Sequence, residues 1–461
     1  MSDIFSIVLA AGKGTRMKSN LPKVLHKISG KPMVNRVIEM LEGIKSNSIF
    51  LVVGYKSEQI IESVGDKVQY VKQKEQLGTG HAVLQAYSEL NDKEGVTIVV
   101  SGDTPLLTLE TIEILIKNHL KNNLTATILT TKINQPTGYG RIIRNSNREV
   151  IRIVEEKDTT LEEKAIKEIN TGIYCFDNKK LFEALIQVNN NNKQGEYYLT
   201  DVIEILRAQG NRIGTYETNN LNESLGINDR VNLAYAEKIL QKRTIERHMI
   251  NGVTITDPDN TYIEDDVQIG TDTIIYPGTY LRGKTIIANE CTIGPNVELS
   301  DTNVESGTII SHSVIDSANI DKNVKVGPFA YIRPDSHIGE SVKIGDFVEI
   351  KNSTIGKGTK IPHHSYIGDA ILGESINIGC GTITVNYDGE KKHQTKIEDR
   401  SFIGCNSNLI APVTIGKDSY IAAGSTITND VPDFALALAR EKQINKEDYV
   451  RKIREKKASK F

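Results

Sequence analysis

The first half of the chain alternates short apolar runs with amphipathic stretches. Four β-rich runs have the length of buried strands: "IFSIVLA" (residues 4–10), "SIFLVVG" (48–54), "VTIVVSG" (96–102) and "ATILTT" (126–131). Between them, residues 32–44 and 109–120 repeat apolar positions at helical spacing. Strands that alternate with helices predict a mostly parallel sheet covered on both faces, which is a Rossmann-like α/β domain.

Beyond residue 250 a six-residue repeat replaces this pattern. An aliphatic residue recurs at every sixth position, usually followed by Gly or a polar residue: Ile320, Val326, Ile332, Ile338, Ile344 and Ile350. The repeat slips by one residue at Ile355 and resumes from Ile397 to Ile427. This period predicts a parallel β-helix of triangular section, with the aliphatic residues stacked inside and residues about 18 apart directly above one another.

A polar helical pattern separates the two halves. Because 461 residues are too many for one compact core, we expect separate domains. The patterns place an α/β domain at residues 1–229, a helical linker at 230–250 and the repeat domain, with a C-terminal tail, at 251–461.

Composition excludes several classes of protein. The net charge of -3 and the 6% of aromatic residues argue against a dedicated nucleic-acid binder. The four cysteines lack metal-ligand spacing, which favours a reducing, cytoplasmic location. No apolar run is long enough to predict a membrane span. The tail, residues 441–461, mixes basic and acidic side chains, so we expect a solvated helix rather than a nucleic-acid or membrane patch.

The first strand runs into a glycine-containing loop, "LAAGKGTRM" at residues 9–17. This loop fits neither the dinucleotide-binding fingerprint nor the nucleoside-triphosphatase loop. Backbone amides between a strand end and a helix start nevertheless suit an anion. Arg16 and Lys23 add positive charge nearby, so the loop is a candidate site for phosphate.

Two cations of the repeat domain form a second candidate anion site. Arg333 and Lys351 each follow an inward isoleucine and lie 18 positions apart. They should therefore lie on adjacent coils, roughly 5 Å apart by strand spacing. Like charges so close repel one another unless an anion lies between them. A phosphate is the simpler interpretation, and two solvated side chains pointing apart are the alternative.

The segment "IPHHSYIGDA" carries a candidate general base. Ile361 and Ser365 take inward positions, which places His363 and His364 outside the apolar stack. A neutral imidazole is well suited to accept a proton near pH 7, although an ordinary surface histidine is the alternative. The polar segment 386–396 must leave the β-helix as a loop, either a functional one or a tolerated insertion.

Several motifs together resemble known families. "LAAGKGTRM", "LPKVL", "QLGTGHA", "SGD", "GYGRI", "EEKD" and "NTGIY" resemble sugar-1-phosphate nucleotidyltransferases. "RP", "EIKNSTIG", "PHHSYIGDA", "GCGTITVNYDG" and "AAGSTI" resemble left-handed β-helix acetyltransferases. Their order along the whole chain is similar to that of the bacterial bifunctional N-acetylglucosamine-1-phosphate uridyltransferase / glucosamine-1-phosphate N-acetyltransferase family.

The resemblance implies two reactions in UDP-N-acetylglucosamine synthesis. Glucosamine-1-phosphate would be acetylated by acetyl-CoA, and UMP would pass from UTP to N-acetylglucosamine-1-phosphate with release of pyrophosphate. It also implies Mg²⁺ and a homotrimer that acts on small molecules. Two alternatives stay open: a uridyltransferase whose β-helix is only structural, and a non-catalytic scaffold.

The resemblance also implies roles for individual residues of the first half. Arg16 and Lys23 would be catalytic, with Lys23 bound to phosphate. Asp103 and Asn228 would hold the metal. The remaining nucleotide and sugar contacts would be Leu9, Ala10, Ala11, Gly12, Gln73, Gly78, Thr79, Gly140, Glu155 and Asn170.

In the second half, His363 would be the general base of acetyl transfer. Glucosamine-1-phosphate would contact Arg333, Lys351, Tyr366 and Asn377. Acetyl-CoA would contact Asn386, Tyr387, Ala423 and Arg440. Cys380 and Cys405 stand where relatives carry Ala or Ser, and we expect small buried side chains there rather than thiol-sensitive ones.

Overall fold

The computed structural model describes residues 3–459. The chain forms two compact units, Met1–Arg243 and Thr244–Phe461. The boundary between them falls inside helix α9 (Arg230–Ile250), the polar helical segment expected between the two halves.

The first unit is built on a mixed, mostly parallel sheet with the strand order β11-β7-β10-β6-β1-β4-β5. The four strands expected from sequence are present: β1 (Ile4–Ala10), β4 (Ser48–Val53), β6 (Val96–Ser101) and β7 (Ala126–Lys132). β1 pairs in parallel with β4 and β6, and β4 pairs in parallel with β5 (Gln69–Lys72). The predicted fold class is therefore confirmed.

One long strand breaks the parallel pattern. β10 (Glu168–Asp177) lies between β6 and β7 and is antiparallel to both. It also pairs with β8 (Gly140–Arg144), which continues to β9 (Val150–Val154). β11 (Ile213–Glu217) is parallel to β7 at the sheet edge.

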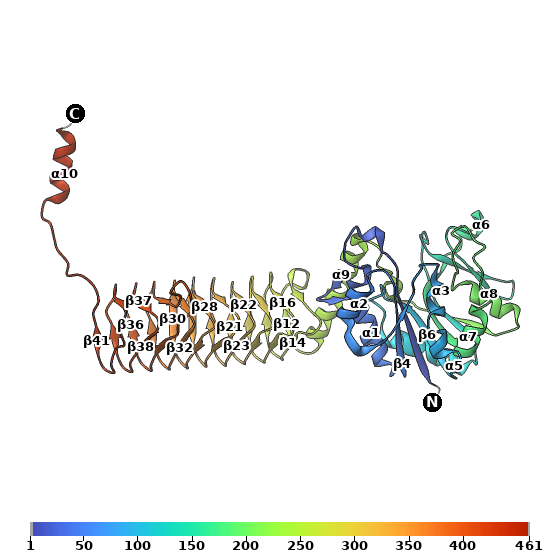
Figure 1. Cartoon of the computed structure of the whole chain (residues 1–461), viewed down its shortest axis with the longest axis horizontal. Coiled ribbons are helices and arrows are strands. Elements are labelled where there is room, and N and C mark those ends of the chain that lie inside the picture. The colour runs from blue at the N-terminus through green and yellow to red at the C-terminus, as the bar shows by residue number, and fades with distance from the viewer. Residues whose placement is uncertain (1–2, 460–461) are drawn as a thin grey trace. The chain divides into compact units, whose positions relative to one another are not determined.

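Helices cover both faces of this sheet (Figure 1). Alternate residues of β1 enter different cores, because side chains alternate between the faces of a strand. Phe5 and Ile7 pack with residues of α3 (Thr79–Leu84), α7 (Asn178–Leu185) and α8 (Asp201–Ala208). Val8 and Ala10 pack instead with residues of α1 (Met33–Gly43), α2 (Ser57–Val64) and α5 (Leu109–Lys121).

In the part of the chain that the structure describes, the second unit is a parallel β-helix of three sheets with 11, 10 and 9 strands. Each strand pairs in parallel with the strand one coil later, as the stacked arrows in Figure 1 show. The predicted aliphatic positions fill one continuous core that includes Ile332, Ile350 and Ile367. The arrangement is consistent with a left-handed β-helix of hexapeptide repeats, which the resemblance implies.

The stacking register follows the sequence spacing. Ile332 pairs with Ile350 at a spacing of 18, whereas Ile350 pairs with Ile367 at 17, which reflects the slip at Ile355. Ile378 pairs with Ile403 because the polar segment leaves the coil between β34 (Ile383–Val385) and β35 (Thr395–Ile397). The predicted loop is therefore present.

The C-terminal tail contains the helix α10 (Tyr449–Ala458), which buries no residue. Its helical conformation agrees with the sequence expectation, although residues 460–461 lie outside the described part of the chain. Between residues 3 and 459, no helix is long and apolar enough to cross a membrane.

Candidate functional site

The glycine-containing loop leaves the carboxyl end of β1 and contains a short helical turn, η1 (Thr15–Met17). Gly14 has a φ of +60°, and a Cβ placed there would lie 2.5 Å from the Cβ of Lys23. Glycine at this position therefore allows Lys23 to approach the loop. A Cβ at Gly12 would meet nothing within 4 Å, so the loop backbone faces open space there.

Four predicted site residues converge beside this loop. The ammonium of Lys23 forms an ion pair with Asp103 and donates a hydrogen bond of 3.3 Å to Oδ1 of Asn228. Arg16 donates to the same Asn228 oxygen at 2.9 Å. The amide N–H of Ile227 donates to the carbonyl oxygen of Asp103 at 2.9 Å, which holds the segment before Asn228 against the end of β6.

The oxygens of Asp103 and Asn228 suit a hard divalent cation. Both face the same ammonium, and a carboxylate and a carboxamide are hard oxygen donors of the type that Mg²⁺ accepts, with phosphate and water as further ligands. No cluster of three or more His, Cys, Asp or Glu side chains with metal-binding geometry occurs in the described residues. Most ligands of such a cation would therefore come from the phosphates of the bound substrate and from water.

The three residues expected to contact uracil lie together at the next strand. Gln73 follows β5, is buried, and donates from Nε2 to the carbonyl oxygen of Gly78 at 3.1 Å. Gly78 has a φ of +113°, and a Cβ there would lie 2.5 Å from the carbonyl oxygen of Tyr197. Thr79 begins α3 and accepts a hydrogen bond of 3.0 Å from the amide of Leu199.

The three expected sugar contacts come from neighbouring strands. Gly140 on β8 pairs with Asn170 on β10. Glu155 follows β9, and Thr200 donates to its Oε1 at 3.3 Å. Burial raises the pKa of Glu155, which favours its protonated form.

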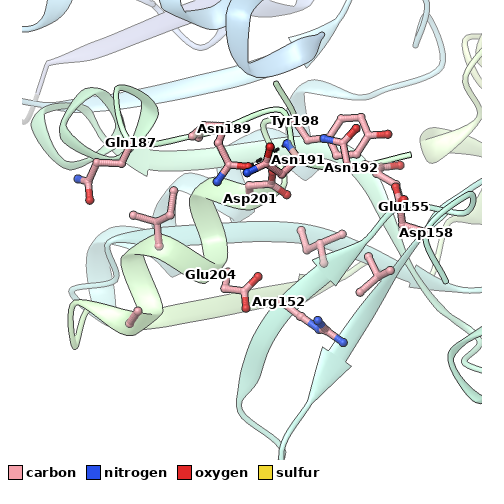
Figure 2. A pocket seen from close by; sticks show the side chains of 15 residues that line it. Arg152, Glu155, Asp158, Gln187, Asn189, Asn191, Asn192, Tyr198, Asp201 and Glu204 are labelled. Atoms are coloured by element: carbon pink, nitrogen blue, oxygen red, sulfur yellow. Dashed lines mark hydrogen bonds between the residues drawn. The ribbon is translucent and has the colours of Figure 1, made fainter. Parts of the chain in front are cut away.

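A polar pocket borders this region (Figure 2). Of the expected site residues only Glu155 lines it, together with other acidic side chains such as Asp158, Asp201 and Glu204. Burial, followed by the charges of Glu204 and Asp158, raises the pKa of Asp201 to about 6. The pocket does not contain Lys23 or Asp103.

The sequence interpretation missed Tyr139. Burial, followed by the charge of Asp103, raises the pKa of this tyrosine. Its position beside Gly140, a predicted sugar contact in "GYGRI", was the signal for it.

In the β-helix, Arg333 and Lys351 have the expected register. The amide of Arg333 donates to the carbonyl oxygen of Ile350 at 2.8 Å. Each cation also has an acidic partner: Arg333 donates to Glu349 at 2.9 Å, and Lys351 Nζ lies 4.0 Å from Asp369. The partners reduce the mutual repulsion on which the anion interpretation rested.

A third cation lies at the same place. Contact with Lys351, followed by its charge, lowers the pKa of Lys392 in the loop after β34. Asp369 also accepts a hydrogen bond from Asn386, which donates to the Tyr366 hydroxyl at 3.3 Å as well. Lys351, Lys392, Tyr366 and Asn386 thus gather around Asp369. The sequence interpretation missed Lys392 and Asp369, although Asp369 stands 18 positions after Lys351.

His363 has a carboxylate partner that the sequence interpretation also missed. Its Nδ1 lies 2.8 Å from Oδ1 of Asp346, and the hydrogen bond lowers the pKa of Asp346. Asp346 pairs with His363 across adjacent coils, at the same spacing of 17 that separates Ile344 from Ile361. That spacing was the signal that could have identified it.

Other expected contacts are spread over the β-helix. Asn377 lies on β33 (Asn377–Ile378), in a different sheet from Tyr366. Tyr387 is exposed in the polar loop. Arg440 donates to the carbonyl oxygen of Ala423 at 2.7 Å, two coils beyond Asn377. Of the four residues expected to hold acetyl-CoA, Ala423 and Arg440 contact one another, whereas Asn386 and Tyr387 belong to the loop between β34 and β35.

The expectation for two cysteines is wrong. Cys380 and Cys405 are free and exposed rather than buried. They follow Gly379 and Gly404 at a corner of the β-helix, where side chains at this position leave the core. The register of Ile378 with Ile403 places the two cysteines on adjacent coils.

Comparisons with known proteins match both units. The "Nucleotidyl transferase" family model matches residues 5–221, "GMPPB C-terminal domain" matches 314–387, and "Bacterial transferase hexapeptide (six repeats)" matches 394–429. A protein of Geobacillus sp. (strain WCH70), named "Bifunctional protein GlmU", is 56% identical over 455 residues, which cover 99% of each chain. The chain belongs to the GlmU family of bifunctional proteins.

Other members of the GlmU family match over a similar length. The protein of the same name from Brevibacillus brevis is 54% identical and covers 98% of each chain. That of Bacillus velezensis is 54% identical over 99% of this chain and all of the relative. A solved "UDP-glucose pyrophosphorylase complexed with UDP-glucose" is 20% identical, with a TM-score of 0.43 over 53% of this chain and all of that one, which is a weak likeness.

Membership of the GlmU family and the family matches in both units identify a bifunctional transferase. A nucleotidyltransferase domain precedes a hexapeptide acetyltransferase domain. This agrees with the bifunctional interpretation of the sequence and disfavours both a uridyltransferase with an inert β-helix and a non-catalytic scaffold.

Proposed function

We propose that this GlmU-family chain makes UDP-N-acetylglucosamine by two transfers at two sites. The β-helix acetylates glucosamine-1-phosphate with acetyl-CoA, and the N-terminal unit then transfers UMP from UTP to the N-acetylated sugar phosphate. The observation that carries the proposal is the convergence of Lys23, Asp103 and Asn228 from three distant segments beside a phosphate-type loop.

In the N-terminal unit, the loop amides and the cations would hold the phosphates of UTP. Asp103 and Asn228 would hold Mg²⁺, which supplies positive charge against the phosphate oxygens when bound. An oxygen of the sugar phosphate attacks the α-phosphorus in line, and pyrophosphate leaves. Lys23 and Arg16 stabilise the negative charge that develops during this step.

The strand ends of this site indicate where each part of the substrates would bind. Gln73, Gly78 and Thr79 would bind the uracil, and Leu9, Ala10, Ala11 and Gly12 would line the nucleotide between the base and the phosphates. Gly140, Glu155 and Asn170 would bind the sugar.

In the β-helix, Arg333, Lys351 and Lys392 would hold the phosphate of glucosamine-1-phosphate. His363 then accepts a proton from the sugar amine as its nitrogen attacks the thioester carbonyl of acetyl-CoA. The bond between carbonyl carbon and sulfur breaks, and CoA leaves with a proton. Tyr366 and Asn386, which contact one another, would orient the sugar and the acetyl group.

The acetyl site requires more than one copy of the chain in this proposal. Asn377, Ala423 and Arg440 lie away from Lys351 and Tyr366 within one chain. A homotrimer of β-helices would bring Asn377 to a neighbour's sugar site and would bring Ala423 and Arg440 to its acetyl-CoA, with Tyr387 at the rim. The substrates, UTP and acetyl-CoA, agree with a cytoplasmic enzyme.

The proposal is tested by incubating the protein with glucosamine-1-phosphate, acetyl-CoA, UTP and Mg²⁺ and analysing the products by mass spectrometry. We expect N-acetylglucosamine-1-phosphate first and UDP-N-acetylglucosamine afterwards. Formation of UDP-glucosamine without acetylation would refute the proposed order, and no acetylated product at all would refute the acetyltransferase assignment.

A further inference from the structure

We propose that Asp346 is a positioning residue for acetyl transfer, fixing the ring of His363 so that its outer nitrogen faces the sugar amine. This inference rests on the proposed role of His363 as the base. The contact that carries it is the hydrogen bond of 2.8 Å between His363 Nδ1 and Asp346 Oδ1.

The backbone is built to bring these two side chains together. β27 (Lys343–Asp346) and β30 (Lys360–His363) pair in parallel, with Asp346 directly opposite His363. A Cβ at the preceding Gly345 would lie only 1.8 Å from the carbonyl oxygen of Pro362, so glycine is required for the close approach of the two coils. The carbonyl oxygen of Asp346 also accepts a hydrogen bond of 2.8 Å from the amide of His364.

The choice of ring nitrogen distinguishes this pair from two others in the β-helix. His337 approaches Asp321 through Nε2 at 3.0 Å, and His393 approaches Asp388 through Nε2 at 2.6 Å. Only at His363, among these three pairs, does the carboxylate face Nδ1. A carboxylate that accepts Nδ1–H selects the tautomer with a free lone pair on Nε2, which is the nitrogen farther from the backbone.

The charges around His363 favour this arrangement. Asp346 on β27 faces His363, His364 stands beside it in the chain, and Cys380 follows in register on the next coil. Of these, Asp346 supplies the negative charge. It stabilises the imidazolium that forms when His363 takes the proton from the amine.

The expected loss of acetyl transfer depends on how far solvent reaches the two side chains. The side chains of His363 and Asp346 are 59% and 41% exposed, so solvent screens their attraction. We therefore expect a loss of about 10-fold, the lower end of the range of about 10- to 100-fold for removing the partner that orients a metal-ligating histidine.

The test uses the full-length protein and measures both transfers for Asp346→Ala, Asp346→Asn and the control Asp321→Asn, which alters the His337 pair. Asp346→Ala should lower kcat of acetyl transfer about 10-fold with little change in KM, because the ring loses its anchor. Asp346→Asn, which keeps the shape of the side chain but removes its charge, should also lower kcat with little change in KM. Uridyl transfer should stay at the wild-type rate in every variant, which shows that the chain is folded.

Two results would overturn the inference while leaving the role of His363 intact. One is a wild-type kcat of acetyl transfer in both Asp346 variants. The other is an equal loss in Asp321→Asn, which would indicate a general effect on the coils. Full acetyl transfer by His363→Ala would instead refute the proposed function of His363 itself.

Discussion

In the N-terminal unit, Lys23 meets side chains 80 and 205 positions away along the chain, whereas in the β-helix His363 meets a side chain only 17 positions away. The first cluster depends on where separate strands of a mixed sheet end. The second depends on the length of one coil. Contacts between polar residues of a solenoid can therefore be predicted from their spacing in the sequence. Contacts between polar residues of an α/β sheet can be predicted only when the order of the strands is known.

This difference also has a functional consequence. Each cluster is held by its own kind of fold, so a change in one should leave the chemistry of the other intact. Damage to either cluster should therefore affect one transfer and spare the other.

The largest effect is expected from removal of the metal. If Asp103 and Asn228 hold Mg²⁺ beside the phosphates, a chelator should abolish uridyl transfer but leave acetyl transfer almost unchanged, because attack of an amine on a thioester needs no metal. Asp103→Asn should act like the chelator, lowering uridyl transfer about 100-fold or more. The test is to measure the initial rates of both transfers on the same sample. An equal loss of both rates would contradict the separation of the two sites.

A large but incomplete loss of the other transfer, acetylation, is expected for His363→Ala. Positioned general bases contribute about 100- to 10,000-fold, so acetyl transfer should fall by that factor. Uridylation of supplied N-acetylglucosamine-1-phosphate should not change. Higher pH should partly rescue the variant, because more of the sugar amine is then unprotonated.

The neighbouring histidine provides a matched control for that variant. His364 is also outside the apolar stack, but the hydrogen bond to Oδ1 of Asp346 comes from the ring of His363. His364→Ala should therefore be far less damaging. A greater loss in His364→Ala than in His363→Ala would show that the base has been assigned to the wrong ring.

The smallest effect concerns stability rather than catalysis. Burial raises the pKa of Asp201 to about 6, so the folded chain binds this proton more tightly than the unfolded chain does. The stability from this proton is fully present below the ordinary pKa of aspartate, near 4, and is lost as the pH rises through about 6. Asp201→Asn should therefore stabilise the N-terminal unit at pH 7.5, by about 1 kcal/mol because the carboxyl is partly exposed.

Urea unfolding at pH 4 and pH 7.5 checks this sign. The gain should appear at pH 7.5, nearly vanish at pH 4, and be confined to the transition of the N-terminal unit. A gain of equal size at both pH values would mean that the carboxyl is not the cause.

The sequence predicts the β-helix more completely than the α/β unit. Ile332 and Ile350 are in the predicted register because a six-residue period leaves few alternatives. The strand runs at 4–10 and 96–102 are equally plain, but nothing local indicates that β10 inserts antiparallel between β6 and β7. That insertion is a tertiary property of the sheet, and single-sequence patterns do not contain it.

The sites show the same limit. Motif resemblance named Lys23, Asp103 and Asn228, but their hydrogen bonds follow only from the fold. The exposure of Cys380 was mispredicted because composition favours burial of a small thiol, whereas its corner position in the coil directs it outward. Asp346 was within reach of spacing arithmetic, because the slip of one residue at Ile355 gives a coil of 17.

The independence of the two sites is tested most directly by mixing two inactive variants. Asp103→Asn should acetylate glucosamine-1-phosphate but not uridylate it, and His363→Ala should do the reverse. Supplied with glucosamine-1-phosphate, acetyl-CoA, UTP and Mg²⁺, each variant alone should form almost no UDP-N-acetylglucosamine, as measured by mass spectrometry. Their mixture should restore its formation, because N-acetylglucosamine-1-phosphate released by one variant is the substrate of the other; a mixture as inactive as its components would contradict two separate sites.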